Sequence, residues 1–490
     1  MSFRPMADRE NIFFTFFLLL FFFLRIYKIG THDLWYDEVA TVGYAQYPWS
    51  NWNAPLYWIV LHFWIKLFAV SEFTLRLPSA LFSFLSLIII FLLGKELFNK
   101  KTGIIASVIM GLSPFHLWYA QEARDYSMVL FLGLLSNWLF YKTLRKSNFK
   151  LWIAFVLVSL AGIYTNYFYI FLFISQGAYI LFFEKLNFRI IISFLLLASG
   201  FVLYLSRFLS KFYFVWQGFW IPRPQWKSLI ITLENFILGY SGFDFLYGIT
   251  NVLTGLFFTS AIAAVCTKAG LRKNFALCLF LFFIPVICVL FFSRIFFSIY
   301  LDRGLIIFSP YFYLILSLGI FFLKQKVKVV LLTILIAIFL VADYGYFKDW
   351  MFMPLEHHLG TYIKKPVKPV VEFLKDNLAP QDILAFTNES TIPSLRFYSQ
   401  GRRYPSFYYF FDPKFPDSSW LRPIQEDSYN IPFYKVNNLK FKRLWVISSD
   451  WGRSGNLDEN SQAVKNWLDK NLRLELVKEF EGLWIFRYSK

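Results

Sequence analysis

The chain has 490 residues, and its composition is too apolar for a string of soluble domains. Hydrophobic residues make up 57% of it and charged residues 16%, against about 45–50% and 25% in ordinary soluble domains. Most of the chain must therefore lie in lipid, and the same composition excludes a disordered protein, a fibre and a disulfide scaffold.

The net charge of +18 is concentrated in the apolar part of the chain. Residues 1–347 carry 28 basic and 14 acidic side chains, whereas residues 348–490 carry 21 and 17. Basic residues beside membrane helices act as topological signals and attract anionic lipid. We therefore expect membrane lipids, and no nucleic acid, as partners.

The apolar stretches predict a polytopic α-helical membrane protein. A membrane-crossing helix needs about 20 apolar residues, and about eleven stretches come close to that length. They lie near residues 11–29, 78–97, 103–120, 126–144, 151–166, 168–184, 190–209, 249–267, 275–293, 304–323 and 327–347.

Basic residues predict the orientation of these spans. A short loop with two or more Lys or Arg residues follows each even-numbered span, as the positive-inside rule requires of cytoplasmic loops. The amino terminus should then be cytoplasmic, and an odd number of spans places the tail outside. This predicts a multi-pass protein of the inner or plasma membrane.

Two outer segments have structure of their own. The first outer loop, 30–77, contains an apolar piece over 55–70 that is interrupted by His62 and Lys66, which predicts a helix lying in the membrane interface. The tail, 348–490, predicts a small extracytoplasmic α/β domain beside a membrane domain over 1–347. Its expected elements are helices over 368–378 and 461–471, strands over 383–386 and 444–447, and two short strands within 474–488.

Acidic residues are scarce in the membrane part, so each one is informative. Asp37 and Glu38 follow Leu34-Trp35-Tyr36 just outside the first span. Partial burial among these aromatic residues would leave Asp37 poorly hydrated and make it a better base. The alternative is a pair of solvated loop acids or a helix start.

A second polar cluster lies at an outer helix end. It contains Gln121, Glu122, Arg124 and Asp125. Ionisable groups at such a depth usually face a cavity or each other. The cluster therefore indicates either a reactive site or a salt bridge from Arg124 that fixes helix packing.

Further cations lie near the outer face. Arg303 could clamp a phosphate through its planar guanidinium, or it could reach lipid headgroups or pair with Asp302. Arg76 has the same two readings, phosphate binding or a headgroup anchor. Lys211 and Arg223, in the loop over 210–248, are generic basic candidates.

The histidines do not form a metal motif. His32, His62 and His116 have no pair at helical ligand spacing, and His357 and His358 form an isolated pair in the tail. Packing at the interface is the better interpretation, and we expect no metal site or cofactor.

Several strings together resemble the bacterial glycosyltransferase family 39 and the dolichyl-phosphate-mannose–protein mannosyltransferase-like proteins. These families belong to the GT-C superfamily, with the lipid A aminoarabinose transferases. The likeness is strong over residues 30–170 and weaker near 164–167 and 301–303. The strings are Leu34-Trp35-Tyr36-Asp37-Glu38, Ala54-Pro55-Leu56-Tyr57, Leu61-His62-Phe63-Trp64, Leu75-Arg76-Leu77-Pro78-Ser79-Ala80 and the run from Ser113 to Tyr126.

The resemblance implies an inverting transfer of sugar from a polyprenyl-phosphate donor at an extracytoplasmic site. Asp37 matches the acid that serves the family as base, and Glu122 and Arg124 match its second-loop motif. Family members often have His where this chain has Asn53 and Asn166. Asn is a poor metal ligand, which disfavours a metal-assisted variant here. The sequence does not settle whether a divalent ion takes part.

The sequence thus predicts an integral-membrane glycosyltransferase, hexosyl or pentosyl, that acts on a lipid, glycan or protein acceptor. Asp37, Glu38 and Glu122 are its candidate catalytic residues. Its candidate phosphate-binding residues are Arg124, Arg303 and Arg76, and Asp125, Tyr57, Asn166 and Lys211 are further candidates. We expect the Asp37 carboxylate and the guanidinium groups to converge on one pocket at the outer face.

Two other classes of protein stay open as alternatives. A flippase for lipid-linked sugars, or another transporter, would need charged groups along the middle of its spans, often in broken helices. In this chain most such groups cluster at outer ends. A receptor-like or structural membrane protein would leave the clusters around Asp37 and Glu122 unexplained.

Overall fold

The computed structural model describes residues 6–49, 54–146, 148–216, 220–241, 243–350, 357, 359, 361, 364–388, 391–399, 407–413, 428–449 and 457–490. The chain forms two compact units. The first unit comprises residues 1–29 and 44–360, and the second comprises residues 30–43 and 361–490. A segment between the first two predicted spans thus belongs to the same unit as the tail.

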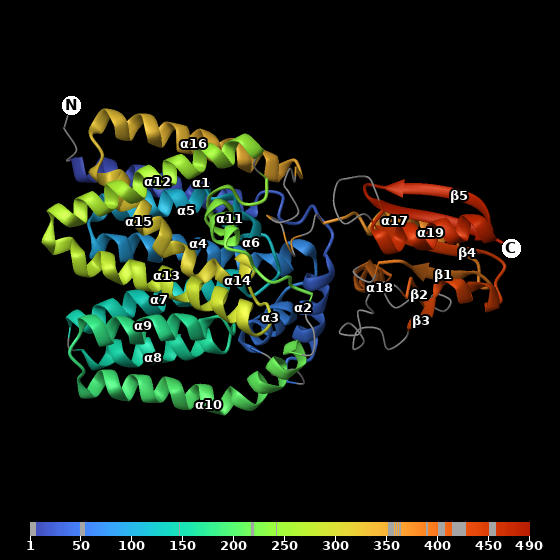
Figure 1. The fold of residues 1–490 in the computed structure, drawn as a ribbon, viewed down its shortest axis with the longest axis horizontal. Coiled ribbons are helices and arrows are strands. Elements are labelled where there is room, and N and C mark those ends of the chain that lie inside the picture. The colour runs from blue at the N-terminus through green and yellow to red at the C-terminus, as the bar shows by residue number, and fades with distance from the viewer. Residues whose placement is uncertain are drawn as a thin grey trace. The chain divides into compact units, whose positions relative to one another are not determined.

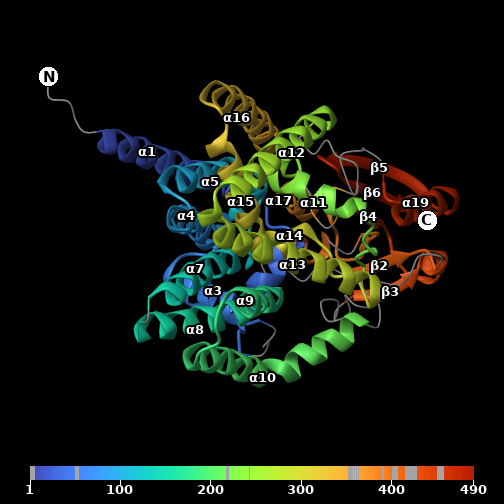
Figure 2. The same cartoon turned by 60° about the vertical axis from the view of Figure 1, so that its left-hand side comes forward.

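The first unit is built of helices that run largely alongside one another (Figure 1). Its α-helices are α1 (Met6–Ile26), α3 (Leu56–Leu67), α4 (Glu72–Leu97), α5 (Lys100–Leu112), α6 (Pro114–Ala120), α7 (Tyr126–Arg145), α8 (Phe149–Ile163), α9 (Tyr169–Phe183), α10 (Phe188–Trp216), α11 (Lys227–Leu238), α12 (Asp244–Thr267), α13 (Arg272–Ile295), α14 (Asp302–Leu305), α15 (Ser309–Phe322) and α16 (Gln325–Phe347). Short 3-10 turns, η1 (Ala269–Leu271) and η2 (Ile306–Phe308), precede α13 and α15. The turned view in Figure 2 keeps α8, α9 and α10 side by side.

The polytopic helical membrane fold is confirmed. Among the described residues, seven helices are long and apolar enough to cross a membrane, or eight if the bent pair α5–α6 is one span. The predicted count of eleven is not confirmed, because α1, α8 and α9 are apolar but shorter where they are described. Every predicted span nevertheless falls on helical structure, although the spans 103–120 and 304–323 each cover more than one helix.

The predicted span over 103–120 is not one straight helix. It consists of α5 and α6, which meet at an angle of 64°. Pro114 causes the break, since proline has no N–H to continue the ladder of α5 but suits the first turn of a new helix. The short helix α6 leads directly into the polar turn at 121–125.

The helix predicted over 78–97 also begins earlier than expected. Ser71 caps α4 in a capping box with Thr74, so the helix starts at Glu72, and Pro78 lies inside it. The apolar piece predicted to lie in the interface forms α3, and α2 (Tyr36–Gln46) precedes it.

The second unit contains a six-stranded sheet in the order β3-β2-β1-β4-β6-β5. Strands β3, β2, β1 and β4 are parallel, and β6 and β5 continue the sheet antiparallel. The elements are α17 (Lys368–Asn377), β1 (Ile383–Phe386), α18 (Ile392–Tyr398), β2 (Phe407–Phe411), β3 (Ser428–Pro432), η5 (Phe433–Asn438), β4 (Leu444–Ser449), α19 (Glu459–Asn471), β5 (Arg473–Phe480) and β6 (Leu483–Ser489).

Alternate residues of the central strands fill two cores. Leu384 and Phe386 of β1 pack toward α17 and α18, whereas Ile383 and Ala385 pack toward α19. Each core needs only every second residue of a strand, because successive side chains point to opposite faces. This confirms the small α/β tail, although α18, β2 and β3 were not among the predicted elements.

Candidate active site

The polar turn after α6 is fixed to two other helices. The Gln121 side-chain amide donates to the carbonyls of Leu24 and Tyr27, at 3.1 and 2.9 Å, and the Tyr346 hydroxyl donates to Gln121 Oε1 at 2.9 Å. The last carbonyls of a helix lack partners inside it, so Gln121 caps the carboxyl end of α1. The turn is thereby held between α1 and α16.

Glu122 is buried inside this turn. Trp118 Nε1 donates to Glu122 Oε1 at 2.9 Å, and the Arg124 N–H donates to the Glu122 carbonyl at 2.8 Å. Only 3% of Glu122 is exposed. These contacts shape the turn that presents Arg124, and a catalytic part for Glu122 stays a prediction.

Two predicted phosphate-binding residues meet on one aromatic ring. The guanidinium carbons of Arg124 and Arg303 lie 5.6 and 6.0 Å from the ring centroid of Tyr126, the first residue of α7. Arg303 lies on α14 and also approaches the ring of Trp220, at 5.8 Å. Cations over aromatic faces gain electrostatic energy. The fold thus brings together two arginines that are 179 residues apart in the sequence.

Asp125 lies beside this pair of arginines. Asn166 Nδ2 donates to Asp125 Oδ2 at 2.7 Å, and Asn166 Oδ1 accepts from the N–H of Phe168 just before α9. Burial raises the pKa of Asp125, although Arg124, the hydrogen bond from Asn166 and Arg303 each act in the opposite direction. Asn166 therefore holds a carboxyl group here.

Helix α4 supports the turn from the other side. Tyr57 on α3 is buried, and its hydroxyl lies 3.0 Å from Ser79 Oγ, which donates to the Arg124 carbonyl at 3.0 Å. Arg76 is 1% exposed and donates to the Ile29 carbonyl at 2.9 Å. A headgroup anchor at the surface, the alternative for Arg76, does not agree with that burial.

Asp302 does not pair with Arg303. Its two oxygens accept hydrogen bonds from α11 instead, from Thr232 Oγ1 at 2.6 Å and from Asn235 Nδ2 at 2.5 Å. This arrangement fixes the start of α14 against α11. Arg303, the next residue, is therefore presented by an anchored segment.

The other predicted residues lie elsewhere or cannot be placed. Lys211 is in α10, but its side chain is outside the described part of the chain, as is Asn53. His62, His116 and His357 have hydrogen-bonding neighbours, namely the Ala45 carbonyl, Ser309 Oγ and Glu234 Oε2. For these three, the structure shows contacts that anchor helices.

The predicted base lies in the second unit. Asp37 is in the first turn of α2, where the Thr41 hydroxyl donates to its carbonyl at 2.8 Å. Glu38 is fully buried, accepts from the N–H of Trp35 at 3.4 Å and lies 3.6 Å from Lys364 Nζ. Glu38 thus caps α2, while the convergence of Asp37 with the arginines stays a prediction.

The sequence interpretation missed several residues that build this site. Tyr126, Trp220, Ser79, Thr232 and Asn235 position the arginines or Asp302. Tyr126 closes the recognised run that starts at Ser113, so its position at the start of a span was a usable signal. Thr232 and Asn235 lie in a segment predicted to be a loop, and nothing in the sequence relates them to Asp302.

Part of the chain is similar in sequence to known proteins. Residues 53–214 match the family model described as dolichyl-phosphate-mannose-protein mannosyltransferase. A segment is 30% identical over 82 residues to YkcB of Bacillus subtilis (strain 168), a protein with a provisional mannosyltransferase name. That match spans only 17% of this chain and 12% of YkcB.

The whole fold is similar to solved structures. ArnT from Cupriavidus metallidurans, apo, has a TM-score of 0.60 at 12% identity, with 98% of both chains covered. The same protein bound to undecaprenyl phosphate scores 0.60 at 11% identity, again over 98% of both chains. An apo oligosaccharyltransferase from Archaeoglobus fulgidus scores 0.50 at 10% identity, with 89% of this chain and 69% of that one covered.

Proposed function

We propose, from the premise that this chain is a GT-C-type protein with a mannosyltransferase-family segment, that it is a membrane glycosyltransferase. It moves one sugar, hexose or pentose, from a polyprenyl-phosphate donor to an acceptor hydroxyl outside the cytoplasm. The family match supports the reaction class. The likeness to a protein whose structure holds undecaprenyl phosphate supports the class of donor.

The observation that carries the proposal is the meeting of Arg124 and Arg303 on the Tyr126 ring. When the sugar leaves its lipid, negative charge grows on the phosphate, and preorganised cations stabilise that charge. A guanidinium presents several N–H donors in a plane and binds phosphate oxygens in pairs. The anchoring of both arginines by hydrogen-bonded neighbours keeps them in place before the reaction.

We assign Asp37 as the base. An acceptor hydroxyl is a weak nucleophile, and a carboxylate within hydrogen-bond reach takes its proton as the new bond forms. The acceptor oxygen attacks the anomeric carbon of the sugar, and the bond from that carbon to the phosphate oxygen breaks. Polyprenyl phosphate leaves, and the configuration at the anomeric carbon of the transferred sugar is inverted. Glu38 is engaged by Trp35 and Lys364 and keeps α2 in place.

The topology proposal follows from the basic loops. With the amino terminus in the cytoplasm, the turn at 121–125 and the tail lie outside, where a lipid-linked sugar is exposed after translocation. The donor's polyprenyl chain enters from the bilayer between helices. This places the reaction in the cell envelope.

The test uses the full-length protein in nanodiscs with a radiolabelled polyprenyl-phosphate sugar. Asp37→Asn should abolish transfer and leave donor binding within twofold of the original. Arg303→Gln should weaken donor binding at least tenfold, because it removes a charge-assisted contact of about 1.5–3 kcal/mol. Matched controls are Asp376→Asn and Arg272→Gln, at residues exposed elsewhere on the chain.

Two outcomes would contradict the proposal. Unchanged turnover in Asp37→Asn removes Asp37 from the role of base. Movement of the labelled lipid across vesicles without any product would favour a transporter instead.

A further inference from the structure

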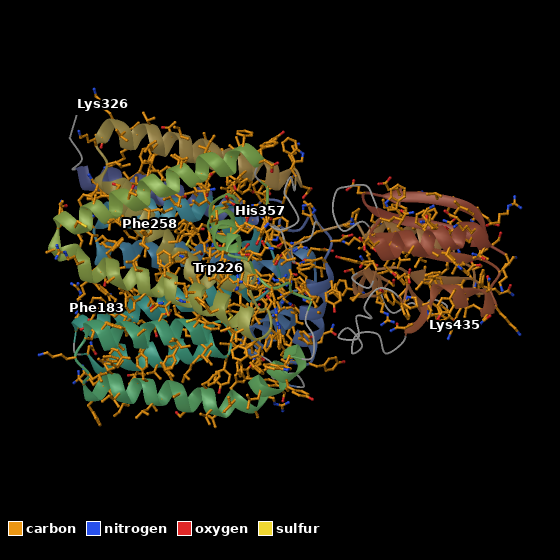
Figure 3. The ribbon with its side chains drawn as sticks, viewed as in Figure 1. Phe183, Trp226, Phe258, Lys326, His357 and Lys435 are labelled. Atoms are coloured by element: carbon orange, nitrogen blue, oxygen red, sulfur yellow. The ribbon has the colours of Figure 1, made fainter. Side chains whose placement is uncertain are left out.

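A separate pocket of about 260 Å³ lies in the first unit, beside the chain segment that carries Arg303. It is lined by the segment before α11, by residues 300–302 and by Leu359. Its polar lining includes Arg223, Gln225, Lys227, Ser228, Tyr300 and Asp302. Trp226, the N-cap residue of α11, and His357, beside the same helix, are labelled in Figure 3. None of the roles proposed above uses this space.

The pocket and the arginine pair share the same two segments. Asp302 lines the pocket, and the next residue is Arg303. On the other segment, Trp220 lies against Arg303, and Pro222 lines the pocket two residues later. A molecule in the pocket would therefore lie next to the proposed site of donor phosphate.

The charges in the pocket favour an anion. Of the described residues that line it, Arg223 and Lys227 are basic and only Asp302 is acidic. The Asp302 oxygens already accept from Thr232 and Asn235, which reduces their repulsion of a second anion.

The acidic group of α11 is also engaged. Glu234 accepts from Asn251 Nδ2 at 2.6 Å and lies 2.9 Å from His357 Nε2. Asn235 donates both to Asp302 and to the His357 carbonyl. These contacts fix the wall of the pocket, and Pro222 and Pro224 stiffen its rim. A preformed concave site with a few placed polar groups is typical of ligand pockets.

We infer that this pocket binds an anionic group, phosphate or carboxylate, carried by the acceptor. Bound there, the acceptor is positioned beside the donor phosphate while its charge is balanced by Arg223 and Lys227. The acceptor role rests on the proposed function, whereas the binding of an anion does not.

The probe is sn-glycerol 3-phosphate, with glycerol as the uncharged control. Binding to the full-length protein in zwitterionic nanodiscs is measured by calorimetry. The double variant Arg223→Gln/Lys227→Gln should bind the phosphate at least fivefold more weakly than the original protein. Lys324→Gln/Lys326→Gln removes the same charge at the amino-terminal end of α16 and should bind it within twofold of the original.

A second measurement separates the acceptor from the donor. Affinity for undecaprenyl phosphate should stay within twofold in both double variants. If Arg223→Gln/Lys227→Gln lost affinity for undecaprenyl phosphate and for glycerol phosphate equally, the pocket would belong to the donor and the inference would be overturned. Equal glycerol phosphate affinity in the original and Arg223→Gln/Lys227→Gln would overturn it as well.

Two further arms deal with lipid headgroups and with folding. Loss of glycerol phosphate binding in nanodiscs rich in phosphatidylglycerol would show that bulk headgroups fill the pocket, against an acceptor role. Arg223→Lys/Lys227→Arg keeps both charges and should restore binding, so a folding defect is distinguishable. Phosphate binding without any sugar transfer would refute the proposed function and leave the anion site standing.

Discussion

At Asp125 the fold disfavours the ionised form of a carboxyl group. It is partly buried, receives a hydrogen bond from Asn166 and feels the charges of Arg124 and Arg303. Burial nevertheless raises the pKa of Asp125 above its usual value. Because the folded state then prefers the neutral acid, the ionised carboxylate costs folding free energy.

This cost predicts a pH-dependent effect of Asp125→Asn. The wild-type penalty is absent below the unfolded pKa, near 3.9, and grows as the pH rises through the higher folded pKa of Asp125. Asparagine at position 125 can still accept a hydrogen bond from Asn166 and carries no charge. The thermal midpoint of the Asp125→Asn variant at pH 7, measured by intrinsic fluorescence in detergent, should equal or exceed that of wild type.

The control for that series is Asp376→Asn, an exposed residue of α17. Any advantage of Asp125→Asn should shrink toward zero as the pH approaches 4. A midpoint that is several degrees lower at pH 7 would mean that the attraction of the arginines outweighs burial.

Among the elements, one carboxylate joins three pieces of the second unit. Asp382 precedes β1, and it accepts from the N–H of Ala379 at 2.9 Å and from Trp445 Nε1 at 3.0 Å. Arg443, just before β4, lies 2.8 Å away. Burial raises the pKa of Asp382, but the hydrogen bonds from Arg443, Ala379 and Trp445 outweigh it, so the pKa is lowered. The stability that this gives is present above the unfolded pKa and is lost as the pH falls through the folded one.

Asp382→Asn should therefore loosen the centre of the sheet at neutral pH. It leaves Arg443 without its carboxylate, and we expect a loss of roughly 2 kcal/mol, less than for a fully buried pair because Arg443 is partly exposed. Hydrogen exchange should rise in β1 and β4, with Asp376→Asn unchanged. Equal protection in both variants would show that the ion pair adds nothing to the sheet.

The elements also show which features a sequence can predict. Apolar length is a strong and local signal, so each helix of membrane-crossing length among the described residues was predicted. Strands β1 and β4, which flank the contacts of Asp382, were predicted as well. The bend at Pro114 is a feature that the sequence can indicate, because proline cannot continue a helix. Helix α11 and strands β2 and β3 were not predicted, and sequence distance is not the reason, because β2 lies closer to its partner β1 than the predicted strand β4 does. The contact of Thr232 with Asp302 is a tertiary feature that no local pattern indicates. The arginines of the site came from motifs, and Tyr126 closes one of these motifs, whereas the meeting of the two arginines on the Tyr126 ring is a tertiary feature.

At the scale of the molecule, the proposed orientation makes one cysteine diagnostic. Cys266 is exposed near the carboxyl end of α12, beside the basic loop that should be cytoplasmic, whereas Cys278 is buried. A membrane-impermeant maleimide should label Cys266 in inverted vesicles and not in intact cells. Gln462→Cys, in the tail of a Cys266→Ser protein, should show the reverse pattern, and Cys266→Ser alone is the control. Labelling of Cys266 from outside would reverse the topology and the side of the reaction.

The second unit joins the first outer loop to the tail. Asp33 accepts from the N–H groups of Val367 and Lys368 at the start of α17, at 2.7 and 2.8 Å, and the Leu34 N–H donates to the Tyr398 hydroxyl at 2.7 Å. A carboxylate at a helix amino terminus satisfies unpaired N–H groups and complements the helix dipole. Helix α2, which carries Asp37, begins at Tyr36, three residues after Asp33. The tail therefore holds the segment that leads to the proposed base.

Asp33→Ala should therefore slow catalysis without weakening donor binding. Loss of the cap costs about 1 kcal/mol and frees the segment before α2, so we expect kcat to fall at least tenfold while the affinity for undecaprenyl phosphate stays within twofold. Asp33→Asn keeps a neutral hydrogen-bond acceptor, so its kcat should lie between those of wild type and Asp33→Ala. Asp376→Ala should behave as wild type. If donor affinity fell together with kcat, Asp33 would support the fold in general; if neither changed, the tail would not position the base. A selective loss of kcat would mean that the tail domain sets the geometry of the reaction while the membrane helices hold the lipid.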